Sequence, residues 1–154
     1  ISFYPLRVKM LDFLQKYSSR YRIKIVTEAC YNSRLCNEEL SILINQSYMT
    51  IACSSIADVL LHKYLEISAS NSVILGNIPS DYRDLFEGNV VEINSFMEDS
   101  VILDTIDNAL ANKETLLEMG QNLHDKVHAD HNLQCASDNF TEVMDALIEK
   151  KREQ

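Results

Sequence analysis

Short apolar segments, separated by stretches with helical periodicity, constrain the fold of this chain more than any other feature. They are Tyr48–Cys53, Ser72–Leu75 and Asn89–Ile93. The first two are too apolar to face water on both sides, so each is expected to be a strand buried within a parallel sheet. Strands that alternate with helices predict a sheet covered by helices on both faces. The expected fold class is therefore α/β, a three-layer Rossmann-like domain with a mainly parallel sheet.

Further segments fit the same pattern. Ile1–Phe3 is expected to be the end of a strand and Tyr21–Val26 alternates like one, which gives about five strands. Helices are expected over 5–18, 37–46, 58–69 and 81–87. In the helix 58–69, the apolar face is expected to comprise Leu61, Leu65 and Ala69. Asn71 follows that helix, and asparagine tolerates the left-handed conformation that often ends one.

The character of the chain changes after residue 95. Ser95 and Glu98 have the spacing of a capping box, which predicts the start of a helix. Three amphipathic helices are expected beyond it. The 154 residues therefore predict one domain, with an alternating strand and helix core over 1–95 and a helical extension over 96–154.

Composition excludes several classes of function. The formal net charge of −9 argues against nucleic acid and anionic membranes as partners. No apolar run is long enough to span a membrane, and no signal sequence opens the chain, so a cytoplasmic location is expected. The first residue is Ile1, which suggests a piece of a larger protein.

Cysteine and histidine spacing does not predict a metal site. Cys30, Cys36, Cys53 and Cys135 form no C-x-x-C pair, and reduced cysteines are expected. His124 and His128 are four residues apart with His131 close behind, a spacing that can bind zinc. No His-Glu-x-x-His pattern accompanies them, so no metal is assigned.

In a parallel sheet of this kind, ligands bind at the carboxyl ends of the strands. Those ends are expected at 4–7, 27–32, 54–58, 76–80 and 94–96. The segment 47–76 is the most informative, because a serine-rich loop leads into a helix that carries a cation and a carboxylate. Such a loop and helix N-terminus can hold the phosphates and ribose of a nucleotide.

Individual residues support this hypothesis, and each has a simpler interpretation. Arg7 opens the first helix, where a phosphate would meet unpaired backbone N–H groups, or it is a surface arginine. Ser54 and Ser55 offer hydroxyls and close backbone approach, or are ordinary loop residues. Lys63 lies three residues before Glu66, a spacing that also permits an ion pair between them.

The segment Lys63–Leu75 resembles the donor-binding, C-terminal domain of group-1, family-4-type GT-B glycosyltransferases. The resemblance covers roughly residues 1–110 and includes a helix with a carboxylate, Glu66, followed by an apolar strand. Asp58 and Glu66 are separated by seven residues, as are two acidic residues of that family.

This resemblance implies a function and a role for each residue. The domain would bind a UDP- or GDP-linked sugar, with Glu66 on the ribose, Asp58 near the sugar as the catalytic residue, and Lys63 on the diphosphate or ribose. Tyr31 would stack on the base, unless it is a partly buried loop tyrosine. Transfer would retain anomeric configuration and require no cofactor or divalent metal. The acceptor would bind to an N-terminal domain of the same polypeptide that these 154 residues do not include.

Other functions of α/β domains compete with this hypothesis. A receiver-like interaction domain would need an acidic cluster after the first strand and an aspartate after the third, and the chain has neither. A dinucleotide-dependent oxidoreductase would need G-x-G-x-x-G, which the three glycines do not form. A catalytically inactive Rossmann-like domain stays open as an alternative.

Overall fold

The computed structural model describes residues 2–26 and 37–152, with the side chains of residues 37, 133, 147 and 152 left out of the description. Its elements are, in order, α1 (Pro5–Lys16), α2 (Asn37–Asn45), β1 (Met49–Ala52), α3 (His62–Ala69), β2 (Val73–Gly76), η2 (Ser80–Tyr82), α4 (Arg83–Phe86), β3 (Val90–Glu92), α5 (Asp99–Ala111), α6 (Lys113–Asp130) and α7 (Leu133–Arg152). The chain is thus an α/β domain followed by a helical extension, as the sequence predicts.

The strands form one parallel sheet with the order β1-β2-β3. Its register pairs Ala52 of β1 with Gly76 of β2, and Gly76 in turn with Glu92 of β3. A Cβ atom at Gly76 would run into the backbone carbonyl of Ala52, so only glycine allows the two strands to approach this closely. The close approach lies at the carboxyl end of both strands.

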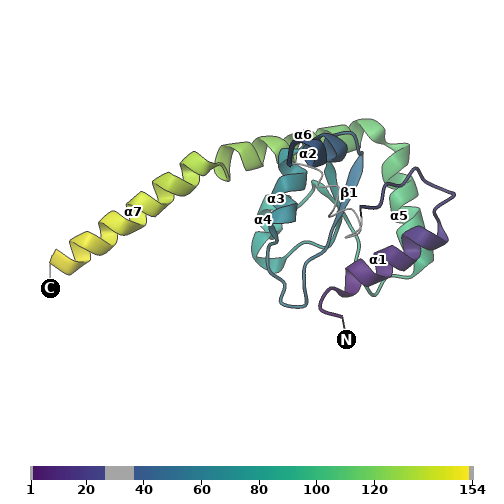
Figure 1. Ribbon diagram of the computed structural model, residues 1–154, viewed down its shortest axis with the longest axis horizontal. Helices are drawn as coiled ribbons and strands as arrows, with labels where there is room; N and C mark the ends of the chain where they lie inside the picture. Colours follow the sequence, from purple (N-terminus) through teal and green to yellow (C-terminus); the bar gives the residue numbers. More distant parts are fainter. Residues whose placement is uncertain (1, 27–36, 153–154) are drawn as a thin grey trace.

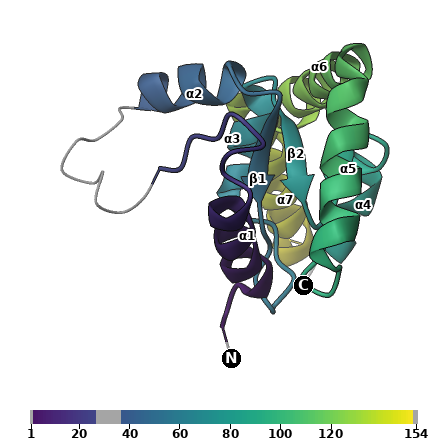
Figure 2. The same cartoon turned by 90° about the vertical axis from the view of Figure 1, so that its right-hand side faces the viewer.

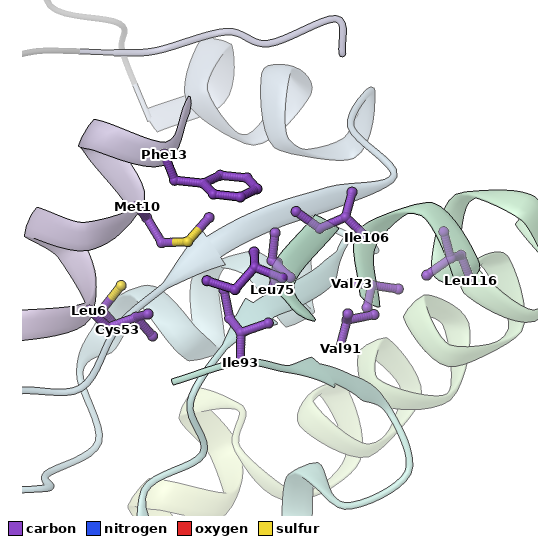
Figure 3. Close-up of a cluster of buried hydrophobic side chains, with 11 residues drawn as sticks. Leu6, Met10, Phe13, Cys53, Val73, Leu75, Val91, Ile93, Ile106 and Leu116 are labelled. Atoms are coloured by element: carbon purple, nitrogen blue, oxygen red, sulfur yellow. The ribbon is translucent and has the colours of Figure 1, made fainter. Parts of the chain in front are cut away.

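Helices cover both faces of the sheet, which gives three layers (Figures 1 and 2). Successive residues of a strand point to opposite faces. Val73 and Leu75 therefore join a cluster with α1 and α5, shown in Figure 3, whereas Ile74 joins a cluster with α2, α3, α4 and α6. Fully buried aromatic rings anchor both clusters, Phe13 in the first and Tyr64 with Phe86 in the second.

The described residues form three strands, fewer than the five or so that the sequence predicts. Residues 21–26 form no strand, and neither do residues 2–3. Alternation alone does not make a strand, because its backbone groups need a neighbouring strand to pair with. Tyr21 instead packs beside α5 and donates a hydrogen bond to Asp107 at 2.8 Å, while Ile25 and Val26 stay exposed.

The predicted burial of the two apolar strands is right for β2 and wrong for β1. All four residues of β2 are buried. Within the described residues β1 is an edge strand, and Ala52 is its one fully buried residue. Tyr48, which directly precedes the strand, is 45% exposed. Met49 and Ile51 still pack against the α1 and α5 side, so the strand is covered on one face.

Helix α3 is shorter than predicted and buries a different face. It begins at His62, so residues 58–61 are loop rather than helix. Its buried residues are Tyr64, Ile67 and Ser68, whereas Ala69 is exposed and Leu65 only half-buried. A start four residues later removes the first turn, and the sheet then selects the face that carries the large Tyr64 ring.

The predicted end of α3 is confirmed. Asn71 has φ 58°, and the amides of Asn71 and Ser72 bond back to the carbonyls of Ser68 and Ile67 at 3.0 and 3.3 Å. This is the Schellman arrangement that often ends a helix. Gly120 of α6 packs directly on Asn71, where a Cβ atom would come within 3.1 Å of the Asn71 side-chain oxygen.

The predicted capping box before α5 is wrong. Glu98 occupies the N-cap position, and its side chain forms no capping hydrogen bond. The side chain of Asn94 stabilises the turn before the helix instead. Its Oδ1 atom accepts hydrogen bonds from the amides of Phe96 and Met97 at 2.9 and 3.2 Å. The side chain of Lys9 reaches across from α1 and donates to the carbonyls of Ser95 and Met97.

The last helix extends away from the body of the domain. Figure 1 shows α7 continuing beyond α6 as one long helix with no neighbouring element. Asn132 caps its first turn by accepting a hydrogen bond from the Cys135 amide at 2.9 Å. Among the described residues, no helix has the length and apolar content needed to cross a membrane.

Candidate functional site

The loops at the carboxyl ends of the strands meet the start of α1 at one end of the domain, the lower end in Figure 2. The amide of Ile56, after β1, donates to the carbonyl of Phe3 at 3.0 Å, which joins the β1 loop to the start of the chain. Helices α1 and α3 both begin beside this loop, and neither has a side-chain cap. The structure therefore brings two uncapped helix N-termini to the end of β1.

The serines after β1 are buried and bond within the loops. Ser54 is 4% exposed and Ser55 is 6% exposed. The amide of Ser54 donates to Oδ1 of Asn77, at the end of β2, at 3.1 Å, and Nδ2 of Asn77 donates to the Ser54 hydroxyl. The Ser55 hydroxyl accepts from the amide of Ala57 at 3.2 Å. These contacts give the β1 loop a fixed path across the end of the sheet.

Asp58 ends this loop in a conformation unusual for a residue with a side chain. Its φ is 51°, and its amide bonds to the Ser55 carbonyl at 3.0 Å, which closes a tight turn. Asparagine and aspartate are the side chains that best tolerate this left-handed region. Oδ2 of Asp58 accepts two hydrogen bonds from Ser80, one from its amide at 3.0 Å and one from its hydroxyl.

Those contacts keep the Asp58 carboxylate ionised. The hydroxyl and amide of Ser80 are the main causes that hold the pKa of Asp58 below its usual range. The Ser54 hydroxyl and the positive charge of Arg83 lower it further. Both Ser80 bonds end on Oδ2. Asp58 therefore presents a charged carboxylate at the end of the sheet.

Two cations flank the end of β1. Arg7, on the first turn of α1, is exposed and holds its guanidinium 4.2 Å from the centre of the Tyr4 ring. Lys63, on the first turn of α3, is exposed as well. Within the described residues neither forms an ion pair. Both positive charges lower the pKa of Cys53, so both act on the end of β1.

Cys53 itself is a buried core residue. It is 4% exposed, and burial raises the pKa of its thiol to about 11 despite the two cations. A thiol with so high a pKa is almost entirely protonated at neutral pH and is a poor nucleophile. Cys53 therefore contributes packing at the base of the site, as a small hydrophobic residue would.

Glu66 lies one turn farther along α3. It is exposed, and Oε1 of its carboxylate lies 3.2 Å from Nδ1 of His62. The contact with His62 takes the place of the ion pair that its spacing from Lys63 permitted. The structure therefore gathers five of the predicted residues around the loop after β1, which are Arg7, Ser54, Ser55, Asp58 and Lys63, and leaves Glu66 exposed one turn farther along α3.

Tyr31, predicted to stack on a base, lies outside the described residues. Three residues of the site were missed by the sequence reasoning: Tyr64, Asn77 and Ser80. Asn77 and Ser80 lie in the predicted strand end 76–80, and a polar residue directly after a buried strand was the available signal. Tyr64 was missed because the sequence pattern predicted that the other face of α3, with Leu61 and Leu65, is buried.

The histidines of α6 do not form a metal cluster. The rings of His124 and His128 are 4.2 Å apart between centroids, and Nδ1 of His124 lies 3.0 Å from a carboxylate oxygen of Asp125. In the part of the chain that the structure describes, no three side chains of the metal-binding types come together. The pair lies on α6, far from the strand ends along the sequence, with His124 half-buried and His128 exposed.

Comparison with known proteins identifies the family. The family model described as glycosyl transferase-like matches residues 7–142, which includes every described strand and all of the site except the start of α1 before Arg7. No curated protein and no solved structure matches this chain significantly. The match extends over most of the chain and agrees with the parallel α/β architecture. The chain belongs to the glycosyl transferase-like family, and its general function is glycosyl transfer.

Proposed function

We propose that this chain is the donor-binding domain of a GT-B glycosyltransferase and holds a nucleoside-diphosphate sugar at the carboxyl ends of its strands. One observation carries the proposal. Arg7 and Lys63, neither in an ion pair within the described residues, flank the end of β1 beside two uncapped helix N-termini. Cations and unpaired amides are the groups that bind a diphosphate.

The same groups suit the chemistry of transfer. When the sugar leaves, negative charge grows on the diphosphate, and fixed cations and helix N-termini stabilise that charge without a divalent metal. Asp58, ionised at the end of the β1 loop, is proposed to lie near the sugar as the catalytic residue. Glu66 is assigned to the ribose and Tyr31 to the base.

The finer features of the reaction are part of the proposal. They are a UDP- or GDP-linked hexose as donor, retention of anomeric configuration, a cytoplasmic location, and an acceptor bound by a further domain of the same polypeptide. On its own, this chain would bind donor without transferring it. Weak donor affinity is expected, since half of the cleft would be absent.

Titration of the isotope-labelled chain with UDP, UDP-glucose and GDP-mannose, followed by NMR, tests the site. Shifts are expected at residues 4–7, 53–58 and 62–66. Lys63→Ala and Arg7→Ala should each weaken binding about tenfold, as the loss of a charge-assisted contact predicts. Lys126→Ala removes an exposed lysine of α6 and serves as the matched control.

Two outcomes would contradict the proposal. One is the absence of binding at millimolar nucleotide, which would favour a Rossmann-like domain without sugar transfer. The other is a set of shifts confined to residues 100–154, which would place the ligand on the helical extension instead.

A further inference from the structure

We infer that Ser80 is a positioning residue for Asp58, which holds oxygen Oδ2 of the carboxylate and leaves oxygen Oδ1 for a hydroxyl group of the donor sugar. The inference rests on the proposed function, because that function places Asp58 beside the sugar. Ser80 follows β2 and Asp58 follows β1, so the pair joins the loops at the carboxyl ends of neighbouring strands. The contacts between the two residues involve no ligand.

Two hydrogen bonds from Ser80 reach the same oxygen atom. The Ser80 amide donates to Oδ2 of Asp58 at 3.0 Å, and the Ser80 hydroxyl donates to Oδ2 as well. Two donors on one oxygen fix the position of the carboxylate more firmly than one donor would. Oδ1 takes part in neither bond, and Asp58 is half-buried rather than enclosed, so this oxygen can accept a hydrogen bond from a ligand.

The core holds Ser80 in place. Pro79, directly before it, is fully buried, and Ser80 begins the 3-10 helix η2. The hydroxyl of Tyr64, a fully buried side chain of α3, donates to the carbonyl of Asn77 at 2.6 Å and fixes the chain just after β2. An amide at the start of a helix has no acceptor within the helix, and Pro79 offers no side-chain cap. Asp58 supplies the acceptor from 22 residues earlier in the chain.

The loop after β1 holds Asp58 as well. A non-glycine residue with φ 51° persists only where its surroundings hold it. The Asp58 amide donates to the Ser55 carbonyl at 3.0 Å, while Ser80 holds the side chain. Backbone and carboxylate are therefore both ordered before a ligand arrives, which favours binding because the ligand does not have to order them. Arg83, paired with Glu92 at 2.9 Å, adds a smaller stabilisation of the charged carboxylate.

A simpler role for the pair is structural, with Asp58 acting only as a cap for η2. The two roles differ in their effect on ligands. Loss of a cap disturbs the fold and therefore affects all ligands of the site alike, whereas loss of a positioning residue for Asp58 affects only a ligand that carries the sugar. A comparison of UDP with UDP-glucose therefore separates the two roles.

The first test needs no ligand. The carboxyl carbon of Asp58 is followed by NMR while the pH is lowered. Ser80→Ala removes one of the two bonds and should raise the pKa of Asp58 towards the ordinary aspartate value, and Ser80→Thr, which keeps a hydroxyl, should restore the lower pKa. Ser47→Ala removes a hydroxyl that donates to the Leu43 carbonyl before β1, and this matched control should leave the pKa unchanged. An unchanged pKa in Ser80→Ala would overturn the inference.

The second test measures the affinities for UDP and UDP-glucose by calorimetry. Ser80→Ala should weaken the binding of UDP-glucose about fivefold and leave the binding of UDP unchanged, and Ser80→Thr should restore the affinity of the wild type. Asp58→Gly removes the carboxylate and suits the left-handed backbone. In the Asp58→Gly background, Ser80→Ala should therefore cause no further loss of affinity for UDP-glucose.

The outcomes separate the inference from the proposed function. Equal losses for the two ligands, or no loss for UDP-glucose, would overturn the inference and leave the proposed function standing. A further loss from Ser80→Ala in the Asp58→Gly background would overturn the inference too. If the wild type binds neither ligand, the proposed function fails and the placement of Asp58 beside the sugar fails with it, while the NMR titration still decides whether Ser80 holds the carboxylate.

Discussion

At the scale of single residues, the site is built from groups whose surroundings differ sharply. Asp58 is charged and held by Ser80, while Cys53 beside it is buried and protonated. The two lie five residues apart in one loop. Residue type already makes Asp58 the charged one of the two at neutral pH, and the local contacts widen the difference by lowering the pKa of Asp58 and raising that of Cys53.

Glu66 provides the sharpest residue-scale prediction of donor binding. Glu66→Gln keeps the shape of the side chain but removes the charge, so a ribose contact worth about 1.5–3 kcal/mol should weaken and affinity should fall about ten- to a hundredfold. Calorimetric titration with UDP-glucose measures this. Stability should change little, because Glu66 is exposed.

Glu118→Gln, on the exposed side of α6, is the matched control and should bind donor as wild type does. Equal affinity of Glu66→Gln and wild type would remove Glu66 from the site.

The raised pKa of the buried Cys53 thiol leads us to expect a loss of stability at alkaline pH. Its pKa is about 11 in the folded chain against 9.0 for a free thiol, so the folded state holds the proton more tightly. The contribution is fully present below about pH 9 and is lost as the pH rises towards 11. Urea denaturation gives the free energy of unfolding at pH 8 and at pH 10.5. Between these two pH values it should fall by about 2 kcal/mol less in Cys53→Ala than in wild type. The same pH-dependent fall in both proteins would contradict the assignment.

At the scale of elements, α3 links the core to the site. Its buried face, with Tyr64 and Ile67 fully enclosed, packs against the sheet, and its first turn carries Lys63. The position of the Lys63 ammonium group thus depends on which face of α3 is buried in the core. An ion pair between Lys16 of α1 and Asp99 of α5, at 2.7 Å, joins the two helices of the opposite layer at the surface.

A pair of alanine substitutions on α3 tests that choice of face. Ile67→Ala should lower the free energy of unfolding by roughly 2–5 kcal/mol, since it opens a cavity in a closed core. Leu65→Ala, at a half-buried position, should cost about 1 kcal/mol. Urea denaturation at constant pH compares the two variants. A larger loss from Leu65→Ala would mean that the helix presents the face that the sequence pattern suggested.

At the scale of the whole molecule, the body of the domain and α7 are distinct parts. The apolar side chains of α7 that the structure describes are exposed, among them Phe140 at 67% and Val143 at 58%. Acidic residues of the helix, such as Glu142 and Glu149, lie on its opposite side by helical spacing. No described side chain of α7 belongs to either core cluster of the body.

Removal of residues 133–154 should therefore leave the body folded. The melting temperature is expected to stay within about 2 °C of the full chain, because none of the α7 side chains that the structure describes belongs to either core cluster. Thermal unfolding followed by circular dichroism measures this, with donor titration to show that the site is intact. A loss of cooperative unfolding would contradict it and would show that α7 supports the fold.

The sequence by itself determined the α/β class, the helical extension and the left-handed end of α3 at Asn71, and it predicted the strand ends at which the candidate site is proposed. These follow from local periodicity, turn chemistry and the order of elements, which act over a few residues. The tertiary structure alone decided which helix face is buried, which alternating segments become strands, and that Asn77 and Ser80 support Ser54 and Asp58. Each of those depends on contacts between segments about 20 or more residues apart, and hydrophobic spacing does not encode such contacts.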